Sequence, residues 1–177
     1  MQQQQLKKIA IIGPESTGKS TLTQQLAEHY KTVWCPEYAR AYLNENGTNY
    51  TFEDLQKIAE GQLILEDTLQ QEATNNLYFI DTEMYVMKVW CEYVFGKCHQ
   101  FILDEIIERK YDLYLLCNVD LPWVADDLRE YPDEAPRKEL YNIYKDILIN
   151  QNTPWVDISG NYEERLTIAV NAVNKLL

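Results

Sequence analysis

Residues 13–20 read Gly13-Pro14-Glu15-Ser16-Thr17-Gly18-Lys19-Ser20 and match the pattern G-x-x-x-x-G-K-S/T at every fixed position. The apolar run Lys8–Ile12 before them predicts a buried strand, which Gly13-Pro14 ends. Leu22, Leu26 and Tyr30 then recur at helical spacing and predict a helix from about Ser20 to Tyr30. A strand, this loop and a helix in succession are the context of a phosphate-binding loop.

The chemistry of phosphate binding explains the spacing. Glycines let the backbone curl so that successive N–H groups converge on phosphate oxygens, and the helix N-terminus adds its positive dipole end. We expect Lys19 to reach the β and γ phosphates of ATP and the Ser20 hydroxyl to ligate Mg²⁺. The residues expected to bind the nucleotide are Gly13, Glu15, Ser16, Thr17, Gly18, Lys19, Ser20 and Thr21.

The rest of the chain alternates short apolar runs with helical patterns. Strands are predicted at Lys8–Ile12, Thr32–Cys35, Leu77–Ile80, Asp112–Cys117 and Trp155–Ile158. Helices are predicted at Ser20–Tyr30, Thr51–Glu72, Thr82–Phe95 and Phe101–Arg109, around Leu140–Leu148, and at Tyr162–Leu176. Continuous apolar strands separated by helices imply an α/β fold in which a five-stranded parallel sheet is covered on both faces. We expect one domain over residues 1–177, with a disordered tail at 1–6 and an irregular, exposed lid at 120–137.

Composition excludes several classes of protein. The 177 residues carry 16 Lys and Arg against 28 Asp and Glu, a net charge of −12, so a nucleic-acid partner is disfavoured. No apolar run reaches the roughly 18 residues of a membrane span, and Met1–Gln5 lacks the basic start and apolar stretch of a signal peptide. Two of the four cysteines, Cys35 and Cys117, sit in strand-like runs, as expected for reduced thiols of a cytoplasmic protein. Nothing in the pattern indicates an oligomeric state.

Several phosphate-loop classes do not fit. A GTPase reads guanine with Asn-Lys-x-Asp after a late strand, but here the fourth strand leads only to Asn118-Val119-Asp120. The D-x-x-G from Asp157 to Gly160 follows the fifth strand rather than the third. A motor or an AAA-type machine usually has a longer chain. A small kinase remains.

Two carboxylates fit a kinase because they lie at strand ends. The second strand leads to Glu37 and the third ends at Asp81. In a parallel sheet such residues face the same crevice as the phosphate loop. One can bind Mg²⁺ and the other can take a proton from an acceptor hydroxyl. Ser20 with Asp81 is the expected metal site and Glu37 the expected base, although the roles of the two acids could be exchanged.

Arg129 and Arg137 lie in the 120–137 excursion, where small phosphate-loop kinases carry a lid. A lid arginine can neutralise charge on the transferred phosphoryl group and contribute roughly 10³ to 10⁵ in rate. The expected catalytic residues are therefore Lys19, Glu37, Asp81, Arg129 and Arg137.

Four segments together resemble the ribosylnicotinamide kinase domain of NadR-type proteins. They are residues 13–22, Pro36-Glu37-Tyr38-Ala39-Arg40, Phe79-Ile80-Asp81-Thr82, and Pro122-Trp123-Val124 with Asp126 and Arg129. The resemblance runs from about Lys8 to the C-terminus. It implies transfer of the ATP γ-phosphate to the 5′-hydroxyl of nicotinamide riboside, which gives nicotinamide mononucleotide in NAD salvage.

The expected acceptor pocket lies near the same segments. Nicotinamide riboside carries a pyridinium cation, which aromatic faces and carboxylates stabilise. The candidate substrate-binding residues are Glu37, Tyr38, Arg40, Tyr85, Trp90 and Trp123. Residues 83–90 and Asp127 depart from the family pattern, and Trp90 also lies on an apolar helix stripe typical of a core residue. Two alternatives stay open: a kinase for another nucleoside, and an ATP-binding regulator of NAD metabolism without turnover.

Overall fold

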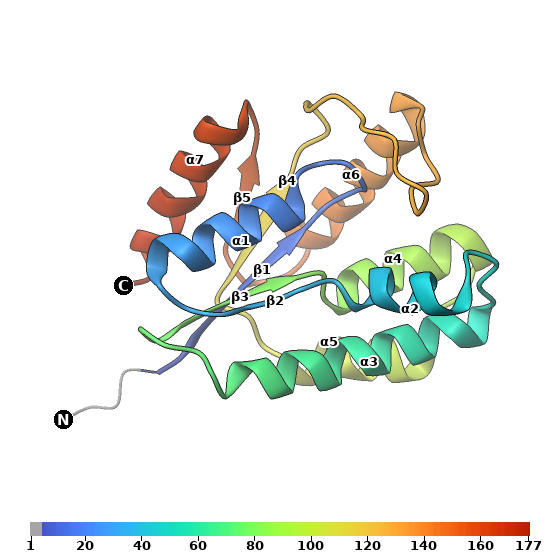
Figure 1. Ribbon diagram of the computed structural model, residues 1–177, viewed down its shortest axis with the longest axis horizontal. Coiled ribbons are helices and arrows are strands. Elements are labelled where there is room, and N and C mark those ends of the chain that lie inside the picture. The colour runs from blue at the N-terminus through green and yellow to red at the C-terminus, as the bar shows by residue number, and fades with distance from the viewer. Residues whose placement is uncertain (1–4) are drawn as a thin grey trace.

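The computed structural model describes residues 5–177, which form five strands and seven helices (Figure 1). All strand pairs are parallel, and the strand order is β2-β3-β1-β4-β5. The strands are β1 (Lys7–Ile12), β2 (Trp34–Cys35), β3 (Leu77–Asp81), β4 (Leu113–Cys117) and β5 (Trp155–Ile158). The helices are α1 (Lys19–Tyr30), α2 (Tyr38–Asn46), α3 (Phe52–Gln70), α4 (Met84–Phe95), α5 (Gln100–Glu108), α6 (Glu134–Ile149) and α7 (Tyr162–Asn174).

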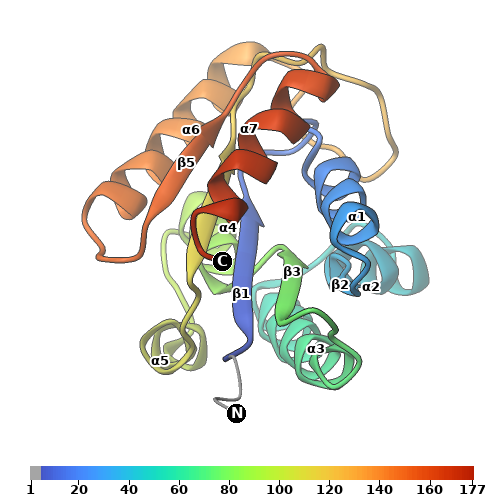
Figure 2. The same ribbon diagram turned by 90° about the vertical axis from the view of Figure 1, so that its left-hand side faces the viewer.

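The alternation of side chains along β1 divides the core into two layers. Ile9 and Ile11 pack on one face against α1 and α7, while Ala10 and Ile12 pack on the other face with residues of α4 and α6 (Figure 2). Successive residues of a strand point to opposite faces, and both faces are covered here, so the strand is apolar throughout. The predicted α/β fold with a five-stranded parallel sheet is confirmed.

A third cluster of buried residues joins α2, α3, α4 and α5 beside the sheet. The predicted capping box starts α3: the Thr51 hydroxyl accepts from the Asp54 backbone N–H, and the Asp54 carboxylate accepts from the Thr51 N–H. Gly96 ends α4 in the left-handed conformation, as its position predicts.

One unpredicted helix and two shifted boundaries are the main differences from the prediction. Helix α2 was not predicted; it buries only Ala39 and Leu43, too little for a clear helical period. Strand β2 is limited to Trp34–Cys35, shorter than predicted. The irregular segment predicted to be a lid ends at Asp133, because Glu134–Arg137 already form the first turn of α6; residues 120–133 are called the lid segment below. Pro136 fits in this turn since the first N–H groups of a helix lack intrahelical partners.

The predicted tail at 1–6 lies outside the described residues for its first four positions. Leu6 packs partly buried against the core. No helix within residues 5–177 is long and apolar enough to cross a membrane.

Candidate active site

The loop after β1 has the backbone shape of a phosphate cradle. Gly13 has φ 142°, and a Cβ there would lie 2.7 Å from the Cys117 carbonyl oxygen, so the loop approaches β4 more closely than a side chain allows. Gly18 adopts the left-handed region with φ 78° just before α1. Inside the loop, the Pro14 carbonyl accepts from the Thr17 hydroxyl at 2.7 Å and from Lys19 Nζ at 2.8 Å. The loop therefore holds its lysine folded over its own backbone.

A buried arginine from α7 braces this loop from behind. The Arg165 guanidinium donates to the carbonyl oxygens of Thr17 at 2.9 Å, Asn118 at 3.0 Å and Gly160 at 2.7 Å, and it pairs with the Asp120 carboxylate. Arg165 as a whole is only 2% exposed to solvent. One side chain thus links the phosphate loop to the ends of β4 and β5.

Ser20 and Asp81 meet where α1 begins and β3 ends. The Ser20 hydroxyl donates to Asp81 Oδ2, and Asp81 is completely buried. Burial raises the pKa of Asp81 to about 6, the negative charge of Glu37 adds to the rise, and Lys19 opposes it. Hydroxyl and carboxylate oxygens are the ligands that Mg²⁺ prefers, in a site completed by phosphates and water. The two residues therefore fit the predicted metal site.

The backbone after Asp81 is strained. Thr82 has φ 75°, an outlier for a β-branched residue, and its N–H donates to the Ile11 carbonyl at 3.2 Å. Glu83 then caps α4 by accepting from the Tyr85 N–H at 2.8 Å. Full burial raises the pKa of Glu83 to about 8. Three consecutive polar residues, from Asp81 to Glu83, are thus buried at one strand end.

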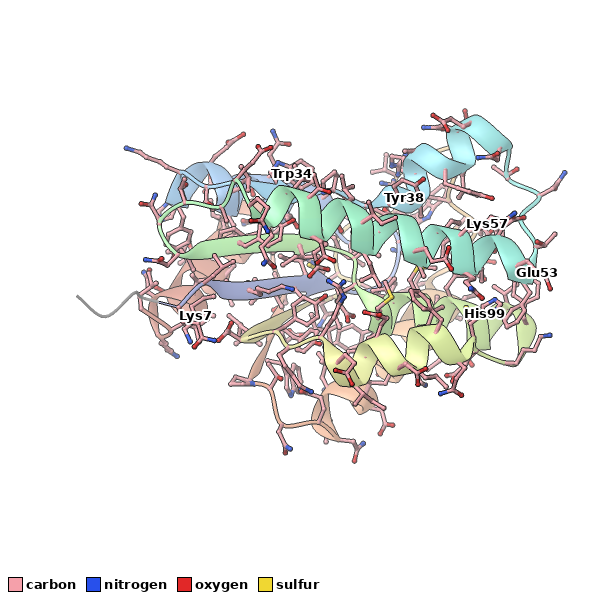
Figure 3. All side chains as sticks on the ribbon, turned by 90° about the horizontal axis from the view of Figure 1, so that it is seen from below. Lys7, Trp34, Tyr38, Glu53, Lys57 and His99 are labelled. Carbon is pink, nitrogen blue, oxygen red and sulfur yellow. The ribbon has the colours of Figure 1, made fainter. Side chains whose placement is uncertain are left out.

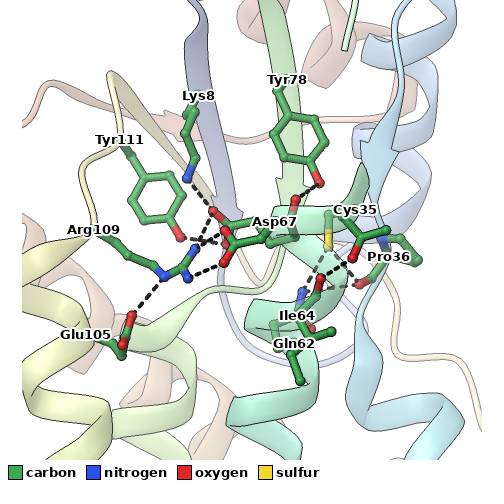
Figure 4. Close-up of polar contacts among 12 residues, drawn as sticks. Lys8, Cys35, Pro36, Gln62, Ile64, Asp67, Tyr78, Glu105, Arg109 and Tyr111 are labelled. Atoms are coloured by element: carbon green, nitrogen blue, oxygen red, sulfur yellow. Dashed lines mark hydrogen bonds and ion pairs between the residues drawn. The ribbon is translucent and has the colours of Figure 1, made fainter. Parts of the chain in front are cut away.

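One glutamine of α3 hydrogen-bonds to the backbone on both sides of Glu37. The buried Gln62 side chain accepts from the Tyr38 N–H at 2.8 Å and donates to the Pro36 carbonyl at 3.2 Å (Figure 4). Because these backbone groups flank Glu37, the amide of Gln62 fixes the turn that presents this carboxylate. Deeper in the same network, the buried Glu66 carboxylate accepts from Lys8 and from the Tyr111 hydroxyl, tying α3 to β1.

A cavity of about 220 Å³ connects these parts. All the loop residues from Gly13 to Thr21 line it. So do four of the other predicted residues: Glu37, Arg40, Trp90 and Arg129. Asp81 lies out of solvent behind Ser20 and Thr82, which both line the cavity. The cavity therefore runs from the phosphate loop to a carboxylate and an aromatic ring beneath an arginine of the lid segment.

Three predicted aromatic residues lie elsewhere. The Tyr38 ring lies against α3, where a Cβ on Gly61 would be 2.1 Å from its Cε1 (Figure 3). Tyr85 packs in the core with its ring centroid 5.6 Å from that of Tyr114. Trp123 is half-buried outside the cavity lining. Its Nε1 is buried and has no partner within residues 5–177. The structure thus places all three rings outside the lining of this cavity.

The two predicted lid arginines differ in setting. Arg129 reaches the cavity from the lid segment and donates to the Val124 carbonyl. Arg137 is 5% exposed in the first turn of α6 and outside the cavity lining. Its Nε and Nη1 have no hydrogen-bond partner among residues 5–177. A buried guanidinium without partners is costly, so an anionic partner would stabilise Arg137.

The sequence alone missed Tyr50, Gln62 and Arg165. Tyr50 accepts from Trp90 Nε1 at 2.9 Å and donates to Glu130 at 3.1 Å, so it links the cavity wall to the lid segment. Each of the three acts through partners distant in the chain. Their positions in predicted helical or loop segments carried no signal of this.

The chain is similar in sequence to one protein family and to curated proteins. A family model described as "AAA domain" matches residues 8–165. The chain is 32% identical to the "Trifunctional NAD biosynthesis/regulator protein NadR" of Escherichia coli (strain K12) and of Salmonella typhimurium, over 97% of its own length and 43% of theirs. It thus spans less than half of these curated relatives.

Solved structures share the fold. The crystal structure of NadR protein in complex with NR matches with a TM-score of 0.76 and 20% identity, over 96% of this chain and 49% of that one. Thymidylate kinase from Candida albicans matches with a TM-score of 0.65 and 18% identity, over 97% of this chain and 92% of that one. The match to a domain of that description concerns residues 8–165, and the expectation that a motor or an AAA-type machine usually has a longer chain stays a prediction.

Proposed function

The chain belongs to the AAA domain family of phosphate-loop proteins, and from that premise we propose that it is an ATP-dependent kinase. The reaction would transfer the γ-phosphate of ATP to the 5′-hydroxyl of nicotinamide riboside and give nicotinamide mononucleotide. The observation that carries the proposal is the single cavity lined by the phosphate loop, Glu37, Trp90 and Arg129. Both reactants of a phosphoryl transfer need such a shared space.

The phosphate loop would hold ATP. Its backbone N–H groups and the N-terminus of α1 form an anion site, and Lys19 is the cation within reach of the phosphates. On binding, Lys19 would exchange the Pro14 carbonyl, 2.8 Å away, for phosphate oxygens. Arg129 from the lid segment, and Arg137 with its unpartnered nitrogens, are the proposed arginines for the developing charge.

Ser20 and Asp81 would hold Mg²⁺. When bound, Mg²⁺ neutralises phosphate charge and aligns the transferred group. Among the described residues no three His, Cys, Asp or Glu side chains gather around one point. A cation here would therefore take its remaining ligands from phosphates and water, as Mg²⁺ commonly does.

Glu37 is the proposed group that orients or deprotonates the acceptor hydroxyl. It lines the cavity at the N-terminus of α2, and its side chain makes no capping hydrogen bond there. Asp81 suits the base role less well because it is completely buried behind Ser20. Proton transfer requires direct reach to the hydroxyl, or reach through one water.

The choice of nicotinamide riboside rests on the cavity and on the relatives. Trp90 and Tyr93 bring aromatic rings to a cavity that also contains Glu37, a combination that suits a pyridinium cation. The relatives from Escherichia coli and Salmonella are named for NAD biosynthesis. A different nucleoside is the second candidate, because a deoxyadenosine kinase shares the fold.

The test is an ADP-release assay with Mg²⁺-ATP and a panel of nucleosides that includes nicotinamide riboside. Lys19→Ala should abolish turnover, and Lys145→Ala, at an exposed α6 position, is the matched control. Glu37→Gln should lower turnover far more than ATP affinity. Turnover that is highest with nicotinamide riboside and lost in Lys19→Ala supports the proposal.

Two other results would change it. Turnover with another nucleoside would keep the mechanism and replace the substrate. ATP binding in calorimetry without ADP release for any acceptor would overturn the kinase and favour a regulator that binds ATP and ligand. Full turnover in Lys19→Ala would show that the phosphate loop is not the ATP site of the reaction.

A further inference from the structure

The phosphate loop carries a carboxylate that accepts hydrogen bonds from the backbone of the lid segment. Glu15 occupies a variable position of the motif, inside a loop whose amides and helix N-terminus form an anion site. A carboxylate turned into that site would compete with phosphate. Instead, Glu15 Oε2 accepts from the Glu130 N–H at 2.9 Å, and Glu15 Oε1 accepts from the Tyr131 N–H. The charge of Glu15 is therefore directed to the lid segment.

The next loop residue holds the other end of the same segment. Ser16 Oγ accepts from the Val124 N–H at 3.0 Å. Two consecutive side chains of the phosphate loop thus fix residues 124 and 130–131, more than 100 positions further along the chain. We call residues 124–131, which these two anchors hold at either end, the strap.

Arg129 lies inside this strap. Its backbone N–H donates to the Asp126 carbonyl at 3.0 Å, and its Nη1 donates to the Val124 carbonyl. The Glu15 anchor begins at the following residue, Glu130. Since both anchors flank Arg129, they determine where its guanidinium enters the cavity that Lys19 and Ser20 also line.

The other side-chain hydrogen bonds from outside the segment to residues 125–131 are weaker. Arg40 pairs with Asp126 at 3.0 Å, but half of the Arg40 side chain is exposed, and exposed ion pairs contribute little. Tyr50 donates one hydrogen bond to Glu130 at 3.1 Å. Backbone N–H groups that donate to an ionised carboxylate form bonds roughly twice as strong as neutral ones. Glu15 is therefore the principal anchor of the strap.

We propose that Glu15 is a positioning residue for phosphoryl transfer, which docks the lid segment on the phosphate loop and thereby places Arg129 beside the transferred phosphate. This inference rests on the proposed kinase function. It gives an acidic residue in an anion-binding loop a specific role, because Glu15 acts on the lid and not on the nucleotide.

The test combines amide hydrogen exchange with kinetics. In the ligand-free protein, Glu15→Ala should speed exchange at the Glu130 and Tyr131 amides, and Glu15→Gln, which keeps an oxygen acceptor, should do so less. Glu53→Ala removes an exposed carboxylate from the first turn of α3 and is the matched control. Glu15→Ala should lower kcat about 10- to 100-fold, with a smaller change in KM for ATP and partial rescue in Glu15→Gln.

A double variant decides whether Glu15 acts through Arg129. In the Arg129→Ala background, Glu15→Ala should reduce kcat by less than about threefold, because coupled residues are not additive. Two results would overturn the proposal. One is that the effects of the two substitutions on kcat multiply, and the other is that amide hydrogen exchange at residues 130 and 131 is unchanged in Glu15→Ala. Absence of turnover in the wild type would instead overturn the kinase function, and with it the role of Glu15 in phosphoryl transfer. Amide hydrogen exchange would still report whether Glu15 holds the lid segment.

Discussion

Replacing Asp81 by asparagine should stabilise the folded protein at neutral pH and abolish phosphoryl transfer. Asp81 is completely buried, and burial together with the charge of Glu37 raises its pKa from 3.8 to about 6. At neutral pH the folded state therefore contains an ionised carboxylate that is less stable there than in the unfolded chain. Asparagine keeps the size of the side chain and the oxygen that accepts from Ser20, but it carries no charge.

The size and sign of the effect follow from the two pKa values. Each pKa unit is worth about 1.36 kcal/mol, so a rise from 3.8 to about 6 corresponds to about 3 kcal/mol once the carboxyl is ionised in both states. The folded state binds the proton more tightly, so wild-type stability falls as pH rises from about 4 to about 6 and then levels off. The new amide also needs partners, and Thr82 Oγ1 is 3.4 Å from one carboxylate oxygen. We therefore expect a net gain of about 1 to 3 kcal/mol at pH 8.

Urea unfolding of the ligand-free wild type and Asp81→Asn between pH 4 and pH 8 measures this directly. The difference in unfolding free energy should be small at pH 4 and should increase as the pH rises from 3.8 to about 6, the ordinary and the raised pKa of Asp81. Asp104→Asn, at an exposed position of α5, is the control and should show no such opening. A stability difference that is equal at pH 4 and pH 8 would refute the reasoning, as would retained phosphoryl transfer in Asp81→Asn.

Three further substitutions test the supports of the site. Gln62→Leu should lower kcat about tenfold or more with little change in KM for ATP, because both backbone partners around Glu37 lose their bonds; an unchanged kcat would contradict this. Gly61→Ala gains about 1 kcal/mol of helix propensity but must displace the Tyr38 ring, at about 1–3 kcal/mol. Thermal unfolding should therefore show a net loss, and a gain would mean that the ring moves freely. Arg165→Lys should destabilise the protein by about 2–4 kcal/mol and weaken ATP binding in calorimetry, since one ammonium cannot replace a guanidinium with three carbonyl partners; unaltered ATP affinity would oppose its bracing role.

The features that local sequence determines were predictable. The phosphate loop depends on glycines and on the order of strand, loop and helix, all of which lie within about two dozen residues. The meeting of Ser20 and Asp81 was also predictable, because one residue opens a helix after the first strand and the other ends the third strand of a parallel sheet. Both positions follow from periodicity and topology without knowledge of side-chain packing.

Side-chain directions were not predictable in the same way. Tyr38 directly follows Glu37 in the sequence, yet its ring is directed to a notch at Gly61 of α3. The contact between Glu15 and Glu130 joins residues 115 positions apart. Contacts of this range depend on how the lid and the helices pack together. A single amino-acid sequence contains no pairwise signal for such contacts.

Energetic costs at the end of β3 and in the first turn of α6 point to a function independently of similarity. Asp81 keeps a buried carboxylate with a raised pKa, and Thr82 adopts φ 75°. Arg137 keeps two guanidinium nitrogens without partners among residues 5–177. Each feature costs stability. Apolar residues in place of the buried charges would make the folded state more stable. Such costs persist where they serve a site. Divalent cations and phosphates are ligands that would turn a buried carboxylate and an unpartnered guanidinium into stabilising interactions.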